Sequence, residues 1–291
     1  MPFYTPLRYP GGKRRLSNFF KVVIKKNGLS DGHYIELYAG GAAVALELLF
    51  DEFASHIHIN DLDRAIYAFW HAALYETEEL CGRIQNVSVT MDEWYRQREI
   101  QEQADDTSLV TLGFSTFFLN RTNRSGIILG GVIGGKGQDG PYKIDARFNK
   151  SNLIQRIKRI GRYRSRITIY NEDAADLIKN TIPILPDRTL VYLDPPYYSK
   201  GKGLYKNFYE HRDHEQIAKL ITEVDRRWIV TYDNTPKIRD MYVNCPSIIY
   251  NLHYSAADRY QGSEVMFLCD ALELPTIDNP AKVSKRTVNS K

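Results

Sequence analysis

The chain has 291 residues, of which 43% are hydrophobic and 25% are charged. This composition is close to the average of globular domains, so it excludes a chain that is disordered throughout. The 39 Lys and Arg residues exceed the 35 Asp and Glu residues by only four, so any attraction to a polyanion must come from local clusters of basic residues.

The cysteines, histidines and apolar segments exclude several other classes. The three cysteines are an odd number without paired spacing, which excludes a disulfide framework and a thiolate zinc site. The seven histidines show no ligand pattern for zinc, so no metal is expected. No segment approaches the roughly 20 apolar residues that a membrane span requires. The sequence therefore predicts a cytoplasmic protein.

The first part of the chain contains two successive β-α units. A short β-prone segment at 34–38 meets the turn Ala39-Gly40-Gly41, and residues 42–50 have the Ala and Leu content of a helix. A second strand at 56–59 is followed by helical spacing over 64–74. Two such units in a row predict a parallel sheet.

The composition of the sequence changes between residues 76 and 152, where polar helix-forming and glycine-rich segments replace the β-α pattern. This region contains a polar helix at 91–102 and a glycine-rich loop at 126–140, so we interpret it as an inserted lobe. Strand patterns then resume and alternate with helices such as 214–224. The expected strands cover 166–170, 190–193, 228–232, 247–252 and 265–269. We therefore assign 1–75 and 153–274 to one catalytic domain, 76–152 to the lobe and 275–291 to a loose basic tail.

The Gly40-Gly41 turn is the first candidate binding site. Ligands of parallel α/β sheets bind at the carboxyl ends of strands, where glycine lets the backbone approach closely. The turn does not match the G-x-G-x-x-G dinucleotide pattern, because Ala43 and Val44 stand where the third glycine should fall. Asp61 follows Gly41 by 20 residues, the spacing of a carboxylate that binds ribose hydroxyls. The alternative for Asp61 is a helix N-cap, which Asp63 could equally supply.

The sharpest motif is Asp194-Pro195-Pro196-Tyr197, which directly follows an apolar strand. A rigid turn that ends a buried strand is the alternative interpretation, since proline removes ladder donors. An acid and an aromatic residue on either side of the prolines exceed what a turn needs.

The chemistry that such a motif suits is transfer of a group to the amino nitrogen of adenine. This nitrogen is a poor nucleophile, because its lone pair is conjugated into the ring. The Asp194 carboxylate and the Pro195 carbonyl could accept both amino hydrogens and direct the lone pair towards a methyl donor, while Tyr197 stacks on the extruded base.

Together with other motifs, this tetrapeptide resembles the Dam-like, alpha-class DNA adenine-N6 methyltransferases. The resemblance extends over nearly the whole chain, in the order in which the family has its motifs. The other motifs are Tyr9-Pro10-Gly11-Gly12-Lys13, Glu36-Leu37-Tyr38-Ala39-Gly40-Gly41, Asn60-Asp61, Asn120-Arg121 and Asn171-Glu172-Asp173. The resemblance implies a Rossmann-like α/β methyltransferase sheet, mostly parallel, with an inserted helical DNA-recognition lobe that carries a hairpin. It also implies S-adenosylmethionine as cofactor.

The resemblance assigns roles to individual residues. Around the cofactor it implies Tyr9, Gly11, Gly12 and Lys13 at the methionine part, Glu36, Tyr38 and Gly40 beneath it, Asp61 at the ribose and Asp173 at the adenine. It implies that Asp194, Pro195, Pro196 and Tyr197 hold the target base. The alternative for Lys13 is a surface charge beside Arg14, and for Asp173 it is a helix N-cap.

The inserted lobe contains the candidate DNA-reading residues. Arg and Asn are well suited to base edges, and they lie here beside glycines and aromatics. The candidates are Asn120, Arg121, Asn123, Arg124, Lys136 and Arg147. A merely solvated loop is the alternative, and the target sequence cannot be transferred, because this segment differs from that of GATC-methylating relatives. Further basic groups that could bind phosphate are 156–159, 162–166 and Lys200, Lys202 and Lys206.

The expected function is methyl transfer to adenine N6 in double-stranded DNA. Related tetrapeptides also serve methyltransferases of cytosine N4, RNA adenine and protein glutamine, and an inactive DNA-binding relative is a further alternative. Aspartate at 194 instead of Ser or Asn favours adenine, and the basic lobe favours nucleic acid. The sequence leaves open whether a cognate restriction nuclease exists and what the oligomeric state is.

Overall fold

The computed structural model describes residues 3–9, 11–199, 209–254 and 260–289. Pro10 of the N-terminal motif and the basic residues Lys200, Lys202 and Lys206 lie outside the described residues. The chain divides into two compact units, one made of Met1–Gly12 and Asp63–Asn171, the other of Lys13–Leu62 and Glu172–Lys291. Residues 76–152 fall within the first unit, which also includes flanking helices. Their function as a separate recognition lobe stays a prediction.

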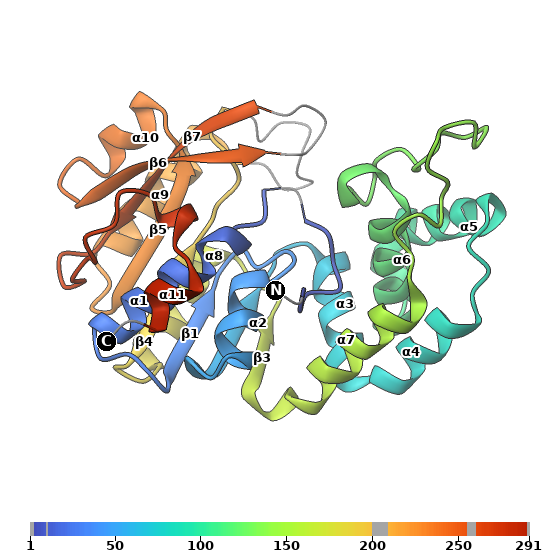
Figure 1. The fold of residues 1–291 in the computed structure, drawn as a ribbon, viewed down its shortest axis with the longest axis horizontal. Helices are drawn as coiled ribbons and strands as arrows, with labels where there is room; N and C mark the ends of the chain where they lie inside the picture. Colours follow the sequence, from blue (N-terminus) through green and yellow to red (C-terminus); the bar gives the residue numbers. More distant parts are fainter. Residues whose placement is uncertain (1–2, 10, 200–208, 255–259, 290–291) are drawn as a thin grey trace. The chain divides into compact units, whose positions relative to one another are not determined.

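The second unit contains a mostly parallel sheet with helices (Figure 1). Its strands are β1 (Gly32–Glu36), β2 (Ala54–Asn60), β4 (Thr189–Leu193), β5 (Arg227–Asp233), β6 (Ser247–Tyr254) and β7 (Tyr260–Leu268). Its α-helices are α1 (Ser17–Lys26), α2 (Ala43–Phe50), α8 (Ala174–Asp176), α9 (His211–Thr222), α10 (Pro236–Met241) and α11 (Lys285–Asn289). Shorter helical turns are η1 (Arg14–Leu16), η5 (Leu177–Thr181), η6 (Ile182–Ile184) and η7 (Pro280–Lys282).

The strands of this unit follow one another in the order β2-β1-β4-β5-β7-β6. The pairs from β2 to β5 are parallel, whereas β7 is antiparallel to both β5 and β6. Glu36 at the end of β1 is in register with Tyr192 of β4, and Leu37 N donates to Tyr192 O over 3.1 Å. The glycine turn after β1 and the Asp-Pro-Pro-Tyr motif after β4 therefore leave the sheet at the same edge.

The sequence explains the central position of β4. All five residues of Thr189–Leu193 are buried, as expected for a strand of a parallel sheet that is covered on both faces. Pro195 and Pro196 follow at once and cannot donate to a neighbouring strand, so the ladder ends there. The parallel α/β sheet that the sequence predicts is confirmed, and the expected strands of this unit form within a few residues of their predicted bounds.

The first unit is mainly helical (Figure 1). Its elements are α3 (Arg64–Tyr75), α4 (Thr77–Asn86), α5 (Met91–Glu102), η2 (Ala104–Asp106), α6 (Leu109–Thr122), η3 (Arg124–Gly126), α7 (Lys150–Arg162), η4 (Arg164–Arg166) and β3 (Ile167–Tyr170). Helix α5 has the bounds that its sequence predicts, because Thr90 caps its first turn. The central helix α6 is buried along most of its length, and the rings of Phe117 and Phe69 on α3 stack at 6.0 Å.

The glycine-rich segment of this unit forms a loop between η3 and α7. The expected hairpin takes the form of a loop that is closed, within the described residues, by one antiparallel bridge between Asn123 and Val132. Repeated glycines disfavour a longer ladder, because glycine has a low strand propensity. Gly126 adopts φ +80°, and a Cβ there would lie 2.3 Å from Arg8 O. The loop therefore approaches the N-terminal segment closely at this glycine.

The tail is the clearest difference from the predicted organisation. Residues 275–291 were expected to be loose, but Val283 and Val288 are buried, and η7 and α11 form within this segment. Asn18 Nδ2 donates to Val283 O over 2.9 Å, and Lys25 Nζ donates to Val288 O over 2.7 Å. Two valines spaced five residues apart were too weak a pattern to predict this packing against α1. Among the described residues, no helix is both long and apolar enough to cross a membrane.

Candidate active site

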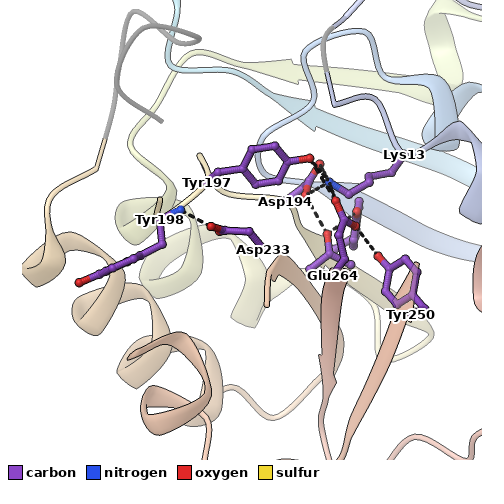
Figure 2. A network of polar contacts seen from close by, with 9 residues as sticks. Lys13, Asp194, Tyr197, Tyr198, Asp233, Tyr250 and Glu264 are labelled. Carbon is purple, nitrogen blue, oxygen red and sulfur yellow. Dashed lines mark hydrogen bonds and ion pairs between the residues drawn. The ribbon is translucent and has the colours of Figure 1, made fainter. Parts of the chain in front are cut away.

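The Asp194 carboxylate lies at the end of β4 and is held by Lys13 (Figure 2) and by a threonine. Lys13 Nζ lies 2.8 Å from Asp194 Oδ1 and 3.1 Å from Oδ2. Thr231 on β5 donates to Oδ1 over 2.8 Å. The Asp194 side chain is 18% exposed, whereas that of Lys13 is 2% exposed. The carboxylate is therefore held by two donors and is only partly exposed.

Lys13 itself is an internal cation. The alternative that it is a surface charge beside Arg14 is wrong, because its ammonium lies among Asp194, Tyr197 and Glu264. The resemblance placed this lysine at the methionine part of the cofactor. The structure brings it to the Asp-Pro-Pro-Tyr motif, and a role towards the cofactor stays a prediction.

Two residues that sequence reasoning missed complete this network. Glu264 on β7 is fully buried, and its Oε1 lies 3.2 Å from Lys13 Nζ. Tyr197 donates its hydroxyl proton to Glu264 Oε1 over 3.1 Å, and Tyr250 on β6 donates to Oε2 over 2.7 Å (Figure 2). The only signal for Glu264 in the sequence was a charged residue directly before the apolar strand segment 265–269.

Asp233, at the end of β5, fixes the chain that follows the motif. Its carboxylate accepts from Tyr198 N over 2.9 Å (Figure 2) and from Ser199 N over 3.0 Å. No sequence pattern indicated this contact, because the partners are backbone groups 34 and 35 positions away. Asp233 therefore holds the backbone directly after Tyr197 against the sheet.

The electrostatics of Asp194 result from opposing effects. Burial raises the pKa of its carboxyl group, the Lys13 ammonium lowers it, and the Glu264 carboxylate raises it again, with a net increase above the usual value. The hydrogen bonds from Lys13 and Thr231 also favour the ionised form. In its ionised form Asp194 accepts hydrogen bonds and donates none.

The glycine turn after β1 is tied to the acid after β2. Asp61 Oδ2 accepts from Gly40 N over 2.9 Å, and Gly40 adopts φ +46°, a conformation that favours glycine. The N-cap of α3 is Asp63, whose side chain accepts from Ala65 N over 2.9 Å. The capping alternative for Asp61 is therefore wrong, and its carboxylate belongs to the turn at the sheet edge.

Two other expected cofactor residues have structural partners at this edge. Asp173 caps α8 by accepting from Ala175 N over 2.8 Å, so its N-cap role is confirmed. Asn60 donates to Leu37 O and to Glu172 O, each over 3.0 Å, which joins the segments after β1, β2 and β3. Tyr38 and Tyr209 share a hydroxyl hydrogen bond of 2.9 Å. Asp61, Asp173 and Tyr38 as cofactor contacts stay predictions.

Tyr9, Gly11 and Gly12 belong to the other compact unit. Gly12 N donates to Tyr9 O over 3.2 Å, and Gly11 adopts φ +76°, so the glycines make a tight turn. Their expected role at the cofactor is a prediction that rests on the sequence resemblance alone.

Glu36 provides a test of whether the sheet edge suits S-adenosylmethionine. Its side chain is buried, and within the described residues Oε2 has no hydrogen-bond partner. Burial, and secondarily the charge of Asp194, raise the pKa of Glu36 well above its usual value. An unpartnered buried acceptor is costly unless a donor arrives. S-Adenosylmethionine carries a cationic ammonium and a cationic sulfonium group. A cation beside Glu36 would favour its ionised form, so Glu36 fits that cofactor.

Two of the candidate DNA-reading residues are internal. Asn120 and Asn123 are both fully buried. Asn120 accepts from Arg8 N over 2.8 Å and donates to Arg8 O and Gly126 O over 2.7 and 2.8 Å. Asn123 accepts from Trp94 Nε1 over 2.6 Å and donates to the carbonyls of residues 127 and 128. Both amides support the loop, and this geometry corrects the expectation that they contact bases.

The basic candidates remain near the surface of the same unit. Arg124, Lys136 and Arg147 are exposed. Arg121 is less exposed and donates from Nε to Arg147 O over 2.8 Å. Burial lowers the pKa of Arg121 to about 9, with further lowering by the charges of Arg8, Arg156 and Arg147. Cations crowded in this way would be stabilised by an anion such as phosphate.

The fold and the site define a class of enzyme before any comparison. A mostly parallel sheet carries a glycine turn after β1, an acid after β2 and Asp-Pro-Pro-Tyr after β4, which is the arrangement expected of a Rossmann-like methyltransferase. Residues 9–259 match the family described as D12 class N6 adenine-specific DNA methyltransferase, and the chain belongs to this family. The match supports S-adenosylmethionine as the cofactor. No curated protein matches the chain.

Several solved structures share low sequence identity with the chain, and three of them are described as methyltransferases. One is TrmK of M. capricolum in complex with S-adenosylhomocysteine, with 6% identity, a TM-score of 0.36 and coverage of 86% of this chain and 69% of that one. Another is the rRNA methyltransferase AviRa of Streptomyces viridochromogenes, with 13% identity, a TM-score of 0.35 and coverage of 87% and 84%. A third is the precorrin-6y C5,15-methyltransferase of Geobacter metallireducens, with 9% identity, a TM-score of 0.35 and coverage of 86% of each chain. These similarities do not bear on the substrate.

Proposed function

We propose that the protein is a site-specific DNA methyltransferase that transfers a methyl group from S-adenosylmethionine to N6 of adenine in double-stranded DNA. The observation that carries the proposal is the Asp194 carboxylate, which is fixed by Lys13 and Thr231 and remains partly exposed. The family supports adenine as the target.

The chemistry follows from what Asp194 can accept. The amino group of adenine donates one hydrogen to the carboxylate and the other to the Pro195 carbonyl, which directs the nitrogen lone pair away from the ring plane. S-Adenosylmethionine, when bound, supplies an electrophilic methyl group on a sulfonium. As the new N–C bond forms and the S–C bond breaks, the nitrogen gains positive charge, which the Asp194 carboxylate stabilises. The surplus proton then leaves the nitrogen through Asp194 to solvent.

The target base must leave the duplex to reach Asp194, because N6 of a paired adenine is hydrogen-bonded inside the stack. Arg124, Lys136 and Arg147 are exposed in the helical unit, and we assign them to the DNA backbone or base edges. Arg121, with its crowded positive charge, is assigned to a phosphate.

The test is incubation of the purified protein with unmethylated genomic DNA and labelled S-adenosylmethionine, followed by modification-sensitive sequencing. The proposal expects N6-methyladenine at one recurring sequence, and Asp194→Ala should abolish labelling while it retains cofactor binding by calorimetry. Parallel reactions with total RNA and with purified protein substrates test the alternatives. Label in RNA alone, at cytosine N4, in protein alone or nowhere would contradict the proposal.

A further inference from the structure

Glu264 is a buried carboxylate outside every motif that carries the family resemblance. It lies on β7, in register with Asp233 of β5 and Tyr250 of β6. Its side chain is fully buried, and both of its oxygens have polar partners (Figure 2). Oε1 faces Lys13 and Tyr197, whereas Oε2 accepts from Tyr250. The carboxylate is therefore held on two sides.

The hydrogen bonds of this network can be satisfied together. The Tyr197 hydroxyl donates to Glu264 Oε1 over 3.1 Å, so its lone pair is available to accept from Lys13 Nζ at 3.2 Å. The three ammonium hydrogens of Lys13 then point to Asp194, Tyr197 and Glu264. Lys13 also lies over the Tyr197 ring, 5.0 Å from its centroid. Glu264 consequently orients both Lys13 and the tyrosine of the catalytic motif.

Stability of the fold does not account for such a residue. Two carboxylates surround one ammonium here, and both Lys13 and Glu264 are almost fully buried. The desolvation cost of a buried ion pair often equals or exceeds its Coulombic gain, so apolar side chains of similar volume could fill this space as well. The arrangement is better explained by what it does to Asp194.

We propose that Glu264, anchored by Tyr250, is a positioning residue that holds Lys13 between itself and Asp194 and balances the charge of the catalytic carboxylate. This proposal rests on the proposed function, because it assumes that Asp194 is the group that accepts the target amine. Glu264 touches neither substrate nor cofactor in this scheme and acts through Lys13 and Tyr197.

The balance at Asp194 depends on groups from every strand around it. Several charged or titratable groups surround Asp194. They are Lys13, Tyr34 and Glu36 (both on β1), Tyr192 (β4), Tyr197, Tyr250 (β6) and Glu264 (β7). Among them, Lys13 favours the ionised form of Asp194, whereas Glu264 disfavours it. Without the Glu264 charge, Lys13 pairs with the Asp194 carboxylate only. This should make Asp194 easier to ionise.

The experiment compares Glu264→Gln, which keeps the shape and removes the charge, with Glu264→Asp and Tyr250→Phe, which keep the charge. For Glu264→Gln we expect kcat to fall about 10- to 100-fold, because Lys13 and Tyr197 lose their orientation, with an unchanged KM for the cofactor. The acid limb of the kcat profile should move down by about one pH unit. Glu264→Asp and Tyr250→Phe should retain the wild-type acid limb. Equal shifts in all three variants, or a loss of activity without any shift, would overturn the proposal.

A second readout does not require activity. Carbon-13 NMR of labelled aspartate carboxyls, with Asp194 assigned by its loss in Asp194→Asn, follows the titration of Asp194 directly. The proposal expects a lower midpoint in Glu264→Gln than in the wild type and an unchanged midpoint in Tyr250→Phe; equal midpoints in all proteins would contradict it. If Glu264→Gln does not fold, Glu264→Asp carries the test, and a displaced midpoint in that variant would refute the proposal. A wild-type protein that fails to methylate DNA refutes the proposed function, and the NMR titration then still decides the role of Glu264.

Discussion

Lys13 and Asp194 are 181 positions apart in the sequence, and the lysine Nζ lies 2.8 Å from Asp194 Oδ1. This ion pair joins the lysine that ends the N-terminal motif to the Asp-Pro-Pro-Tyr motif. Lys13 and Asp194, which the resemblance assigns to different ligands, thereby lie together at the end of β4. Lys13 also pairs with Glu264, so its loss would leave two carboxylates facing each other in a buried place.

The first prediction concerns this ion pair. Replacement Lys13→Met should lower the free energy of unfolding by about 3 to 5 kcal/mol, because removal of one partner leaves buried charge uncompensated. Urea denaturation followed by circular dichroism measures the change. Arg15→Met, at an exposed neighbouring cation, is the matched control and should change stability by less than about 0.5 kcal/mol. Equal stabilities of the two variants would show that Lys13 is not an internal counter-ion.

The second prediction concerns the pH dependence of activity. Burial and Glu264 raise the pKa of Asp194, and Asp194 must be ionised to accept the target amine. Activity should therefore fall as the pH drops through this raised pKa, above the usual aspartic acid value of about 3.9. Single-turnover methylation rates in a pH series test this, with refolding controls at each pH. A rate that stays constant down to the usual pKa of aspartic acid would mean either that the pKa of Asp194 is not raised or that ionised Asp194 is not required.

The third prediction concerns Asp61. Asp61→Ala should weaken binding of S-adenosylmethionine, since a charge-assisted hydrogen bond to ribose hydroxyls is worth roughly 1.5 to 3 kcal/mol. Asp63→Ala is the control, because Asp63 caps α3 and its loss should lower stability without a matching loss of affinity. Isothermal titration calorimetry provides the affinities. Unchanged affinity in Asp61→Ala would restrict this residue to its hydrogen bond with Gly40 N.

The fourth prediction separates reading of DNA from support of the loop. Arg124→Ala should cost about 1 to 3 kcal/mol of DNA binding and relax preference at one target position if Arg124 contacts a base edge. If it contacts phosphate, binding should weaken on all sequences alike with a shallower salt dependence. A randomised target library measures both. An identical rate profile with unchanged affinity would remove Arg124 from the DNA surface.

The control for that experiment is Asn120→Ala. Asn120 is buried and its amide bonds to the backbone of Arg8 and Gly126. Its loss should destabilise the protein by about 1 to 3 kcal/mol, because buried backbone groups lose their partners. The order of preferred target sequences should not change. An altered preference without loss of stability would return Asn120 to the recognition surface.

The sequence by itself determined the architecture and the main catalytic candidate. The β-α units at 34–50 and 56–74 were predictable because a parallel strand is a short apolar run and a helix has a 3.6-residue period, which are both local signals. Asp194 was predictable because Asp-Pro-Pro-Tyr is rare and directly follows such a strand. The spacing of Asp61 after Gly41 pointed to the sheet edge. The structure was needed to show that Asp63, and not Asp61, caps α3.

Only the tertiary structure decided which polar residues surround Asp194 and which lie inside the helical unit. Glu264, Tyr250 and Thr231 reach the site from β7, β6 and β5, and their register is set by strand pairing between distant segments, which no local pattern encodes. The same is true of Asn120 and Asn123: an amide suits a base edge and a buried backbone equally well, so burial decides between the two roles. Lys13 shows the principle most directly. Its side chain looks like one more charge in a basic segment, and only the fold, by placing two carboxylates beside it, makes it the cation of the site.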